Sequence, residues 1–133
     1  MLELKRKDNM EDLKAYFEKK KGLGVLSTSD ADGRVDAAVY SRPHFMDDNT
    51  VAFIMRERLT RHNLQSNPHA AFLFVEELPG YSGKRLYLTK VREEENSELI
   101  DSLSRRQYAN PPGENRFLVY FTIDKVLPLI GGA

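Results

Sequence analysis

Apolar and polar residues alternate along most of the chain with a period of two, which is typical of β-strands that bury one face. Between these stretches, three segments repeat their apolar residues at the spacing of an α-helix. We expect helices over residues 9–20, 60–66 and 97–108. We expect strands over residues 23–28, 35–40, 50–55, 69–76, 85–91 and 116–123, the last continuing to about 127 past a kink at 124–125.

Capping residues predict where two of the helices begin. Asn9 is the expected N-cap of the first helix, because an Asn side chain can accept a hydrogen bond from a backbone N–H of the first turn. Asn96 is the expected cap of the third helix, and the acidic run 93–95 leads into it. The inward-facing positions of this third helix are expected to be Leu99, Ile100 and Leu103.

Short turn sequences separate several of the strands. Asp30-Ala-Asp-Gly33 ends in Asp-Gly, a strong signal for a β-hairpin, and residues 47–50 form a second turn. The hairpin is not a calcium loop, because position 39 holds a valine where an EF-hand needs a glutamate. The loop 78–83 is not a P-loop, because no glycine stands five positions before Gly83.

The short connections favour an antiparallel sheet, because parallel strands need long crossovers. Closure of about six strands into a small barrel would hide the sheet edges, although the strand period alone does not distinguish a barrel from an open sheet. At 133 residues the chain is expected to form a single domain. Aromatic residues that alternate on the strands are expected in its core, namely Phe72, Phe74, Phe117 and Phe121.

Composition argues against several classes of function. Lys+Arg and Asp+Glu both number 20, so no net charge attracts nucleic acid or an anionic membrane. The chain has no cysteine, which excludes disulfides, thiolate metal sites and thiol catalysis. The N-terminal residues form no apolar signal core, and no window approaches the roughly 20 apolar residues of a membrane span. We therefore expect a soluble, cytoplasmic protein.

The strongest candidate chemistry lies where the third strand ends and the short helix begins. Arg56, Arg58, Thr60 and Arg61 crowd this point. The first turn of a helix offers free backbone N–H groups and the positive end of the peptide dipole, and arginine forks bind phosphate oxygens in pairs. The stretch therefore predicts a phosphate-binding site. In so small and neutral a domain, we expect the phosphate to belong to a bound cofactor.

The three histidines give no metal signal. His62 and His69 are seven residues apart and separated by a proline, which is not the i, i+4 spacing of a helical zinc pair. We therefore predict no metal site. His44 follows the second strand, where it is either an ordinary turn residue or a proton donor close to a bound cofactor.

The segment Asn63-Leu-Gln-Ser-Asn-Pro-His-Ala-Ala-Phe-Leu-Phe74 resembles the Asn-Leu-x-x-Asn-Pro motif and apolar strand of the FMN-binding split β-barrel superfamily. This superfamily contains the pyridoxamine 5′-phosphate oxidases and small flavin-binding proteins, and the order of elements over roughly residues 9–127 is similar to it. The resemblance implies a mainly β (α+β) fold, a six-stranded antiparallel Greek-key split barrel with about three flanking helices. It also implies a homodimer with FMN bound between the protomers.

The resemblance further implies which residues hold the flavin. They lie on the second strand, on the third strand and in the loop that follows it, namely Val39, Tyr40, Ser41, Arg42, Phe53, Ile54, Met55, Arg56, Arg58, Leu59, Thr60 and Asn63. Thr60 departs from the family, which often has a lysine at this position. A C-terminal Arg-x-His segment that grips the substrate of pyridoxamine phosphate oxidases is also missing, so we do not expect that reaction.

Two hypotheses on function follow from this resemblance. The first is an FMN-binding protein that acts as a flavin-dependent oxidoreductase or electron carrier, with Tyr108 of the second protomer as a candidate cover for the flavin ring. The second is a non-catalytic dimeric module on the same fold that binds haem, a deazaflavin or no ligand. The substrate and the choice between NADH and NADPH cannot be derived from the sequence.

Overall fold

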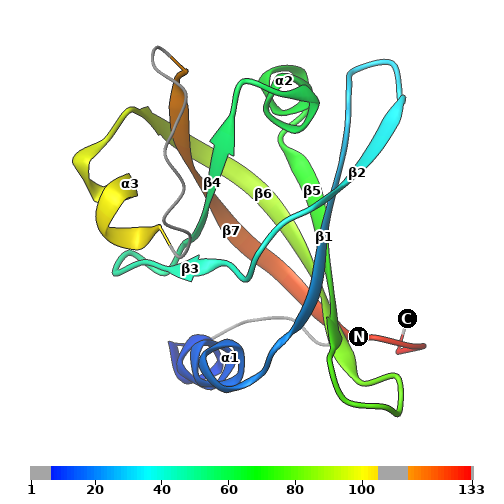
Figure 1. Ribbon diagram of the computed structural model, residues 1–133. Coiled ribbons are helices and arrows are strands. Elements are labelled where there is room, and N and C mark those ends of the chain that lie inside the picture. The colour runs from blue at the N-terminus through cyan, green and yellow to red at the C-terminus, as the bar shows by residue number, and fades with distance from the viewer. Residues whose placement is uncertain (1–6, 105–113, 133) are drawn as a thin grey trace.

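The computed structural model describes residues 7–104 and 114–132 of the chain (Figure 1). Its helices are α1 (Lys7–Lys19), α2 (Leu59–Ser66) and α3 (Glu98–Leu103). Its strands are β1 (Gly22–Ser29), β2 (Val35–Val39), β3 (His44–Phe45), β4 (Val51–Arg56), β5 (His69–Glu76), β6 (Gly83–Glu95) and β7 (Arg116–Pro128).

All of these strands join one antiparallel sheet with the order β2-β1-β5-β6-β7-β4-β3. The order runs from one edge to the other, so the sheet is open, but it curls strongly (Figure 1). Phe53 on β4 lies 5.2 Å, ring to ring, from Phe72 on β5, although β6 and β7 separate these strands in the sheet. Tyr40, just after β2, meets Phe53 edge to face at 5.9 Å. The curl therefore brings the two ends of the sheet around one core.

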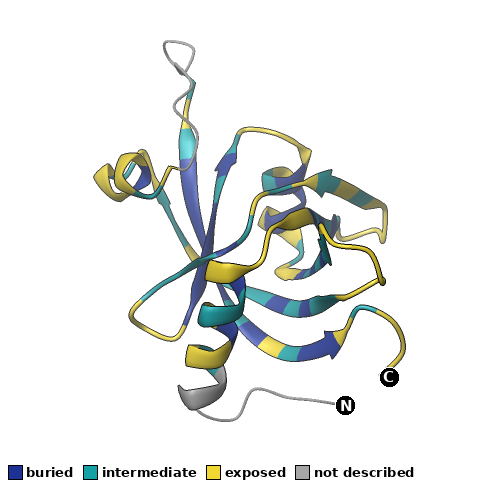
Figure 2. Ribbon diagram, turned by 60° about the horizontal axis from the view of Figure 1, so that its bottom comes forward, coloured by how far each residue is buried: buried dark blue, intermediate teal, exposed yellow. Residues whose placement is uncertain are grey.

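The main core fills the inside of this curl, and a smaller one lies outside it. Leu13 and Phe17 of α1 close one end of the main core. On the outer side of β4 and β7, Ala52, Leu118 and Tyr120 pack with Ile100 of α3. Because both faces of β4 and β7 are covered, consecutive residues of these strands are buried, as the dark segments of Figure 2 show.

The hairpins, the helix α2 and the aromatic core confirm the sequence predictions. The side chain of Asp30 accepts hydrogen bonds from the backbone N–H groups of Asp32 and Arg34, which closes the β1–β2 turn. Gly33 has φ +83° in this turn, a left-handed conformation that favours glycine. The predicted kink of the last strand is a β-bulge, because the register with β6 shifts by one residue at Asp124. The four phenylalanines expected in the core are all buried.

Two predictions about the N-terminal half need correction. Within the described residues, the sheet has one strand more than the six expected, because β3 is only two residues long and too short to show alternation in the sequence. Helix α1 begins at Lys7, so Asn9 lies inside its first turn and is not the cap.

The predictions around α3 were wrong in four respects. The acidic run 93–95 belongs to strand β6, because its residues pair with β7 in register. Ser97 is the N-cap, since its hydroxyl accepts from the N–H of Leu99, whereas Asn96 adopts φ +50° and accepts from the N–H of Arg116. Leu99 is exposed, and α3 already ends at Leu103. Residues 105–108 of the predicted helix lie outside the described residues, as does Tyr108.

Candidate cofactor site

Two arginines meet one carboxylate where β4 leads into α2. Arg56 Nη1 lies 3.3 Å from Glu114 Oε2, and Arg58 Nη2 lies 2.9 Å from Glu114 Oε1. The Glu114 side chain is only 16% exposed, so this ion pair is partly shielded from water. We call these three residues the arginine cluster. Strand pairing positions it, because Arg56 is opposite Arg116 at the start of β7, two residues after Glu114.

Three polar side chains gather beside the start of α2. Thr60 is buried, and its hydroxyl hydrogen-bonds to that of Tyr40 and lies 3.5 Å from Asp36 Oδ2. Burial raises the pKa of Tyr40, the hydrogen bond from Thr60 opposes this rise, and the charge of Asp36 adds to it. The phenol therefore stays protonated at neutral pH and can donate a hydrogen bond. The curl of the sheet thus joins two predicted site residues that are far apart in the sequence.

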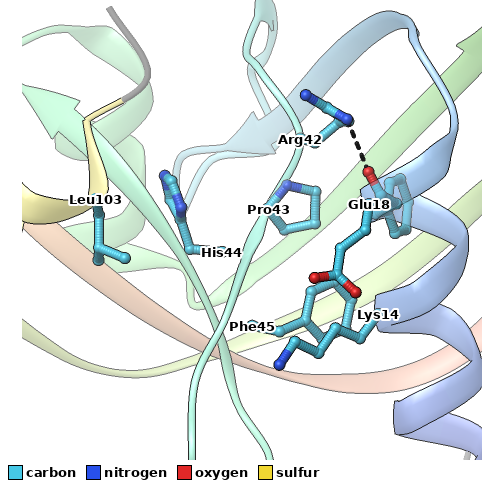
Figure 3. A pocket seen from close by; sticks show the side chains of 8 residues that line it. Lys14, Glu18, Arg42, Pro43, His44, Phe45 and Leu103 are labelled. Atoms are coloured by element: carbon cyan, nitrogen blue, oxygen red, sulfur yellow. Dashed lines mark hydrogen bonds between the residues drawn. The ribbon is translucent and has the colours of Figure 1, made fainter.

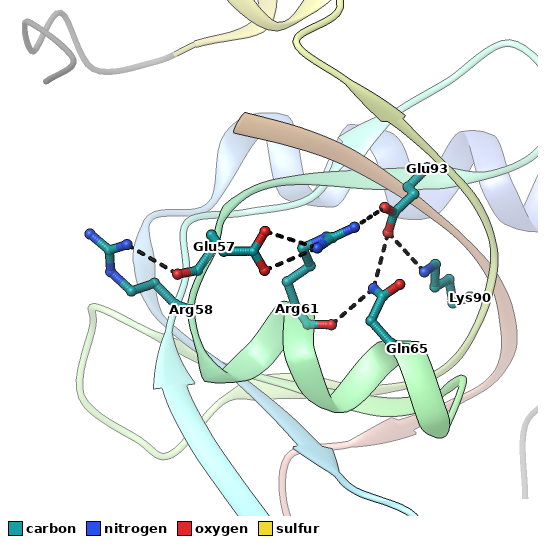
Figure 4. A network of polar contacts seen from close by, with 6 residues as sticks. All are labelled: Glu57, Arg58, Arg61, Gln65, Lys90 and Glu93. Carbon is teal, nitrogen blue, oxygen red and sulfur yellow. Dashed lines mark hydrogen bonds and ion pairs between the residues drawn. The ribbon is translucent and has the colours of Figure 1, made fainter. Parts of the chain in front are cut away.

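Arg61 does not belong to the arginine cluster. Its guanidinium contacts Glu57 at 3.0 Å and Glu93 at 2.5 Å (Figure 4). The same group stacks over the ring of Phe117 at 3.7 Å. Glu93 also accepts hydrogen bonds from Lys90 and Gln65. We call Glu57, Arg61, Gln65, Lys90 and Glu93 the α2–β6 network. This network fixes the helix α2 to the sheet. Of the three neighbouring arginines, Arg56 and Arg58 therefore form the arginine cluster, whereas Arg61 anchors the helix.

Asn63 also holds α2 in place. Its side-chain amide donates to the Thr28 hydroxyl on β1 over 3.1 Å, and both residues are buried. A buried amide without this partner would be costly, so the contact orients the helix whose first turn carries Arg58 and Thr60.

Arg42 and His44 lie in a different place. Arg42 donates to the carbonyl oxygens of Phe17 and Lys20 at the end of α1, over 2.8 and 3.1 Å. His44 and Arg42 line a pocket of about 390 Å³ between α1 and the segment before β3 (Figure 3). Apolar and charged side chains line the pocket together, namely Lys14, Phe17, Glu18, Arg42, Pro43, His44, Phe45 and Leu103.

The remaining predicted residues fall into two groups. Phe53 and Met55 are buried in the main core, and Ile54 packs on the smaller one, so Phe53 and Met55 have only backbone atoms to offer a ligand. Val39 and Leu59 are 68% and 55% exposed, which is unusual for apolar side chains of this size, and Ser41 is exposed too. These apolar surfaces beside the polar clusters suit a ligand or a second protein surface.

Sequence reasoning missed Asp36 and Glu114. Neither residue carries a local signal, because each is a single acidic residue among ordinary turn and strand residues. Only the sheet pairing places Glu114 beside the end of β4. Within the described part of the chain, no group of three or more His, Asp or Glu side chains is placed to hold a metal ion. In residues 7–104 and 114–132, no helix has the length and apolar character needed to cross a membrane.

The curled open sheet, with α1 and α2 at its ends, is the split β-barrel fold. The family model described as pyridoxamine 5′-phosphate oxidase matches residues 10–128, and the chain belongs to this family. None of the curated proteins matches the chain.

Solved structures with the same fold are named for different ligands. An FMN-binding protein from Syntrophomonas wolfei is 24% identical, with a TM-score of 0.72, and the match covers 93% of this chain and 88% of that one. An F420 reductase is 16% identical, with a TM-score of 0.62 and coverage of 84% and 93%. The haem storage protein HutZ from Vibrio cholerae is 19% identical, with a TM-score of 0.52 and coverage of 88% and 92%. At these identities the likeness concerns the fold alone.

The arginine cluster fits the phosphate end of a flavin nucleotide. Two guanidinium groups already converge on an anion, since the Glu114 carboxylate sits between them. A phosphate offers the same type of acceptor with more oxygens and more charge. The donor set present is therefore one that an FMN phosphate can use.

Proposed function

We propose that this chain is an FMN-binding protein that acts as a flavin-dependent oxidoreductase or electron carrier. The observation that carries the proposal is the arginine cluster, in which Arg56 and Arg58 converge on one anion. It lies at the end of β4 and the start of α2, where the family resemblance puts the flavin phosphate. The match to the family model over residues 10–128 supports the same assignment.

We also propose that two copies of the chain form the functional unit. The edge strand β2 exposes Val35 and Val39 at 82% and 68%. Val39 pairs with Val25 of β1, and Leu23 of β1 is 53% exposed as well. An apolar stripe on an unpaired edge is an aggregation hazard unless another surface covers it. A second copy would cover this stripe and enclose the apolar side chains that border the polar clusters.

The side chains of the chain would bind, orient and supply protons. Arg56 and Arg58 would hold the phosphate by charge-assisted hydrogen bonds. The protonated Tyr40 hydroxyl would donate to a ligand oxygen beside α2, and His44 would be the candidate proton donor from its pocket. A bound flavin supplies hydride and electron transfer itself, so no separate catalytic constellation is required.

A second candidate function is a non-catalytic module that binds haem, a deazaflavin or no ligand. The observation that favours it is the charge around the phosphate-binding site. The Glu114 carboxylate pairs with Arg56 and Arg58, and Asp36 adds a negative charge beside Thr60. Thr60 itself supplies a neutral hydroxyl where the family often has a lysine. A phosphate-binding site whose positive charges are neutralised attracts a phosphate dianion less strongly than a site with a net positive charge does.

The visible absorption spectrum of the purified protein tests both candidates. It is recorded as isolated, and again after incubation with excess FMN followed by desalting. The proposal expects a flavin spectrum with one retained FMN per chain. A protein that stays colourless with FMN, but develops a haem absorption band after haem is added, would replace the first candidate with the second.

A further inference from the structure

Glu114 supplies an anion to both arginines of the arginine cluster. Its two carboxylate oxygens face Arg56 and Arg58, one each, at 3.3 and 2.9 Å. Its side chain is 16% exposed, whereas that of Arg58 is 65% exposed. The carboxylate is therefore more shielded from water than the outer arginine.

The backbone around Glu114 allows the side chain to leave. The register between β4 and β7 ends at the Arg56–Arg116 pair, so Glu114 stands outside the sheet and none of the ladder pairs includes it. Asn115, the next residue, is held by the side-chain amide of Asn96 at 3.2 Å. A change in the Glu114 side chain therefore costs no strand pairing.

We propose that Glu114 is a built-in competitor for phosphate, which neutralises Arg56 and Arg58 in the free protein and is displaced when a phosphomonoester binds. This inference rests on the proposed function and adds a specificity-determining residue to it. A phosphomonoester near neutral pH carries more negative charge than a carboxylate and has three terminal oxygens for the two guanidinium forks. It can therefore replace Glu114, whereas a ligand without phosphate has no anionic group to compete for the two arginines.

The experiment measures dissociation constants of FMN and riboflavin for the wild type and for Glu114→Gln, by quenching of flavin fluorescence. Glutamine keeps the size of the side chain and removes its charge. Glu114→Gln is expected to bind FMN about five- to tenfold more tightly, the effect of removing one partly shielded ionic competitor. Riboflavin, which lacks the phosphate, should bind both proteins equally.

Glu77→Gln is the matched control. Glu77 is an exposed glutamate just after β5, at the end of that strand remote from α2, so this variant makes the same change in net charge away from the arginine pair. Its FMN affinity should equal that of the wild type. Equal thermal midpoints of the variants and the wild type would show that each remains folded.

The outcomes separate the inference from the function on which it rests. If the wild type binds FMN and Glu114→Gln binds it equally or more weakly, the inference is overturned, Glu114 orients the arginines, and the proposed function stands. If neither protein binds FMN, the proposed function fails. The inference is then tested by measuring the thermal midpoints of both proteins with added inorganic phosphate. It requires that phosphate raise the midpoint of Glu114→Gln more than that of the wild type. An equal rise, or none, overturns it.

Discussion

Arg58 is the single residue on which the proposed flavin site depends most. It is 65% exposed and starts the helix α2, so its guanidinium can reach a ligand without a change in the core. Replacing Arg58 by alanine should weaken FMN binding by ~1.5–3 kcal/mol, the range for a charge-assisted hydrogen bond. The affinity is measured by fluorescence titration.

Arg85→Ala is the control for this prediction. Arg85 donates to the carbonyl of Pro128 near the C-terminal end of the described chain, at the opposite end of the molecule from α2 (Figure 1). Its loss should leave FMN affinity unchanged. An unchanged affinity of Arg58→Ala itself would mean that the phosphate is not held at the arginine cluster.

Gly24 is a second residue whose identity the fold requires. A Cβ atom at this position of β1 would lie 2.4 Å from the backbone oxygen of Tyr40 and 2.5 Å from Cζ of Phe72. Gly24→Ala should therefore lower the free energy of unfolding by about 1–3 kcal/mol, as overpacking of a core does. Urea denaturation measures this. The added Cβ atom would clash with the backbone of Tyr40, the residue after β2. A variant as stable as the wild type would therefore contradict the close approach of β1 to Tyr40.

At the scale of elements, the α2–β6 network determines how α2 sits on the sheet. Burial pulls the pKa of Glu93 upward, but hydrogen bonds from Arg61, Lys90 and Gln65 outweigh it and lower the pKa from 4.5 to about 2. A carboxyl whose pKa is lower in the folded state stabilises the fold above its unfolded pKa, and this contribution is lost as the pH falls toward the folded pKa. The relevant window therefore lies between pH 4.5 and about 2.

This network predicts a specific pH dependence. On going from about pH 6 to about pH 3, the wild type should lose on the order of 1 kcal/mol more unfolding free energy than Glu93→Gln, which cannot titrate at this position. Denaturant titrations at several pH values measure the difference. Parallel pH profiles of the two proteins would show that Glu93 is not held as an ion pair. Glu95→Gln, at an exposed position on the same strand, should follow the wild type.

At the scale of the whole molecule, the exposed stripe on β2 predicts the oligomeric state. The wild type should have twice the 15.3 kDa mass of the chain by light scattering, and Val39→Glu should have the mass of one chain. The charge cannot be buried between two copies without a large cost, whereas the folded monomer tolerates it because Val39 is 68% exposed. FMN retention should fall together with the dimer.

Val91→Glu is the control for this prediction. Val91 is also an exposed valine, but it stands at the irregular part of β6 and not on the edge strand β2. This variant should keep the mass of the wild type. A wild type that is monomeric would contradict the proposed dimer. A dimer that persists in Val39→Glu would show that the interface does not include the exposed stripe on β2.

The limits of sequence reasoning are clearest at the acidic run and at the arginines. The three consecutive glutamates were expected to lead into the third helix, yet they pair with β7 as part of β6, and Arg61 and Lys90 satisfy the charge of Glu93. The arginines 56, 58 and 61 look equivalent in sequence, yet two converge on Glu114 and one is tied to β6. In both cases the structural role of the residue depends on a partner that is distant in the sequence.

The sequence by itself determined six of the seven described strands, the Asp-Gly hairpin, the helix α2, the aromatic core and the family resemblance. These features depend on periodicity, backbone preference and local motifs, which are physical properties of neighbouring residues. Only the tertiary structure decided that β4 and β2 meet around one core, that Tyr40 contacts Thr60, and that Glu114 bridges Arg56 and Arg58. Such contacts depend on sheet order and curl, which bring distant residues together and leave no trace in the sequence beside them.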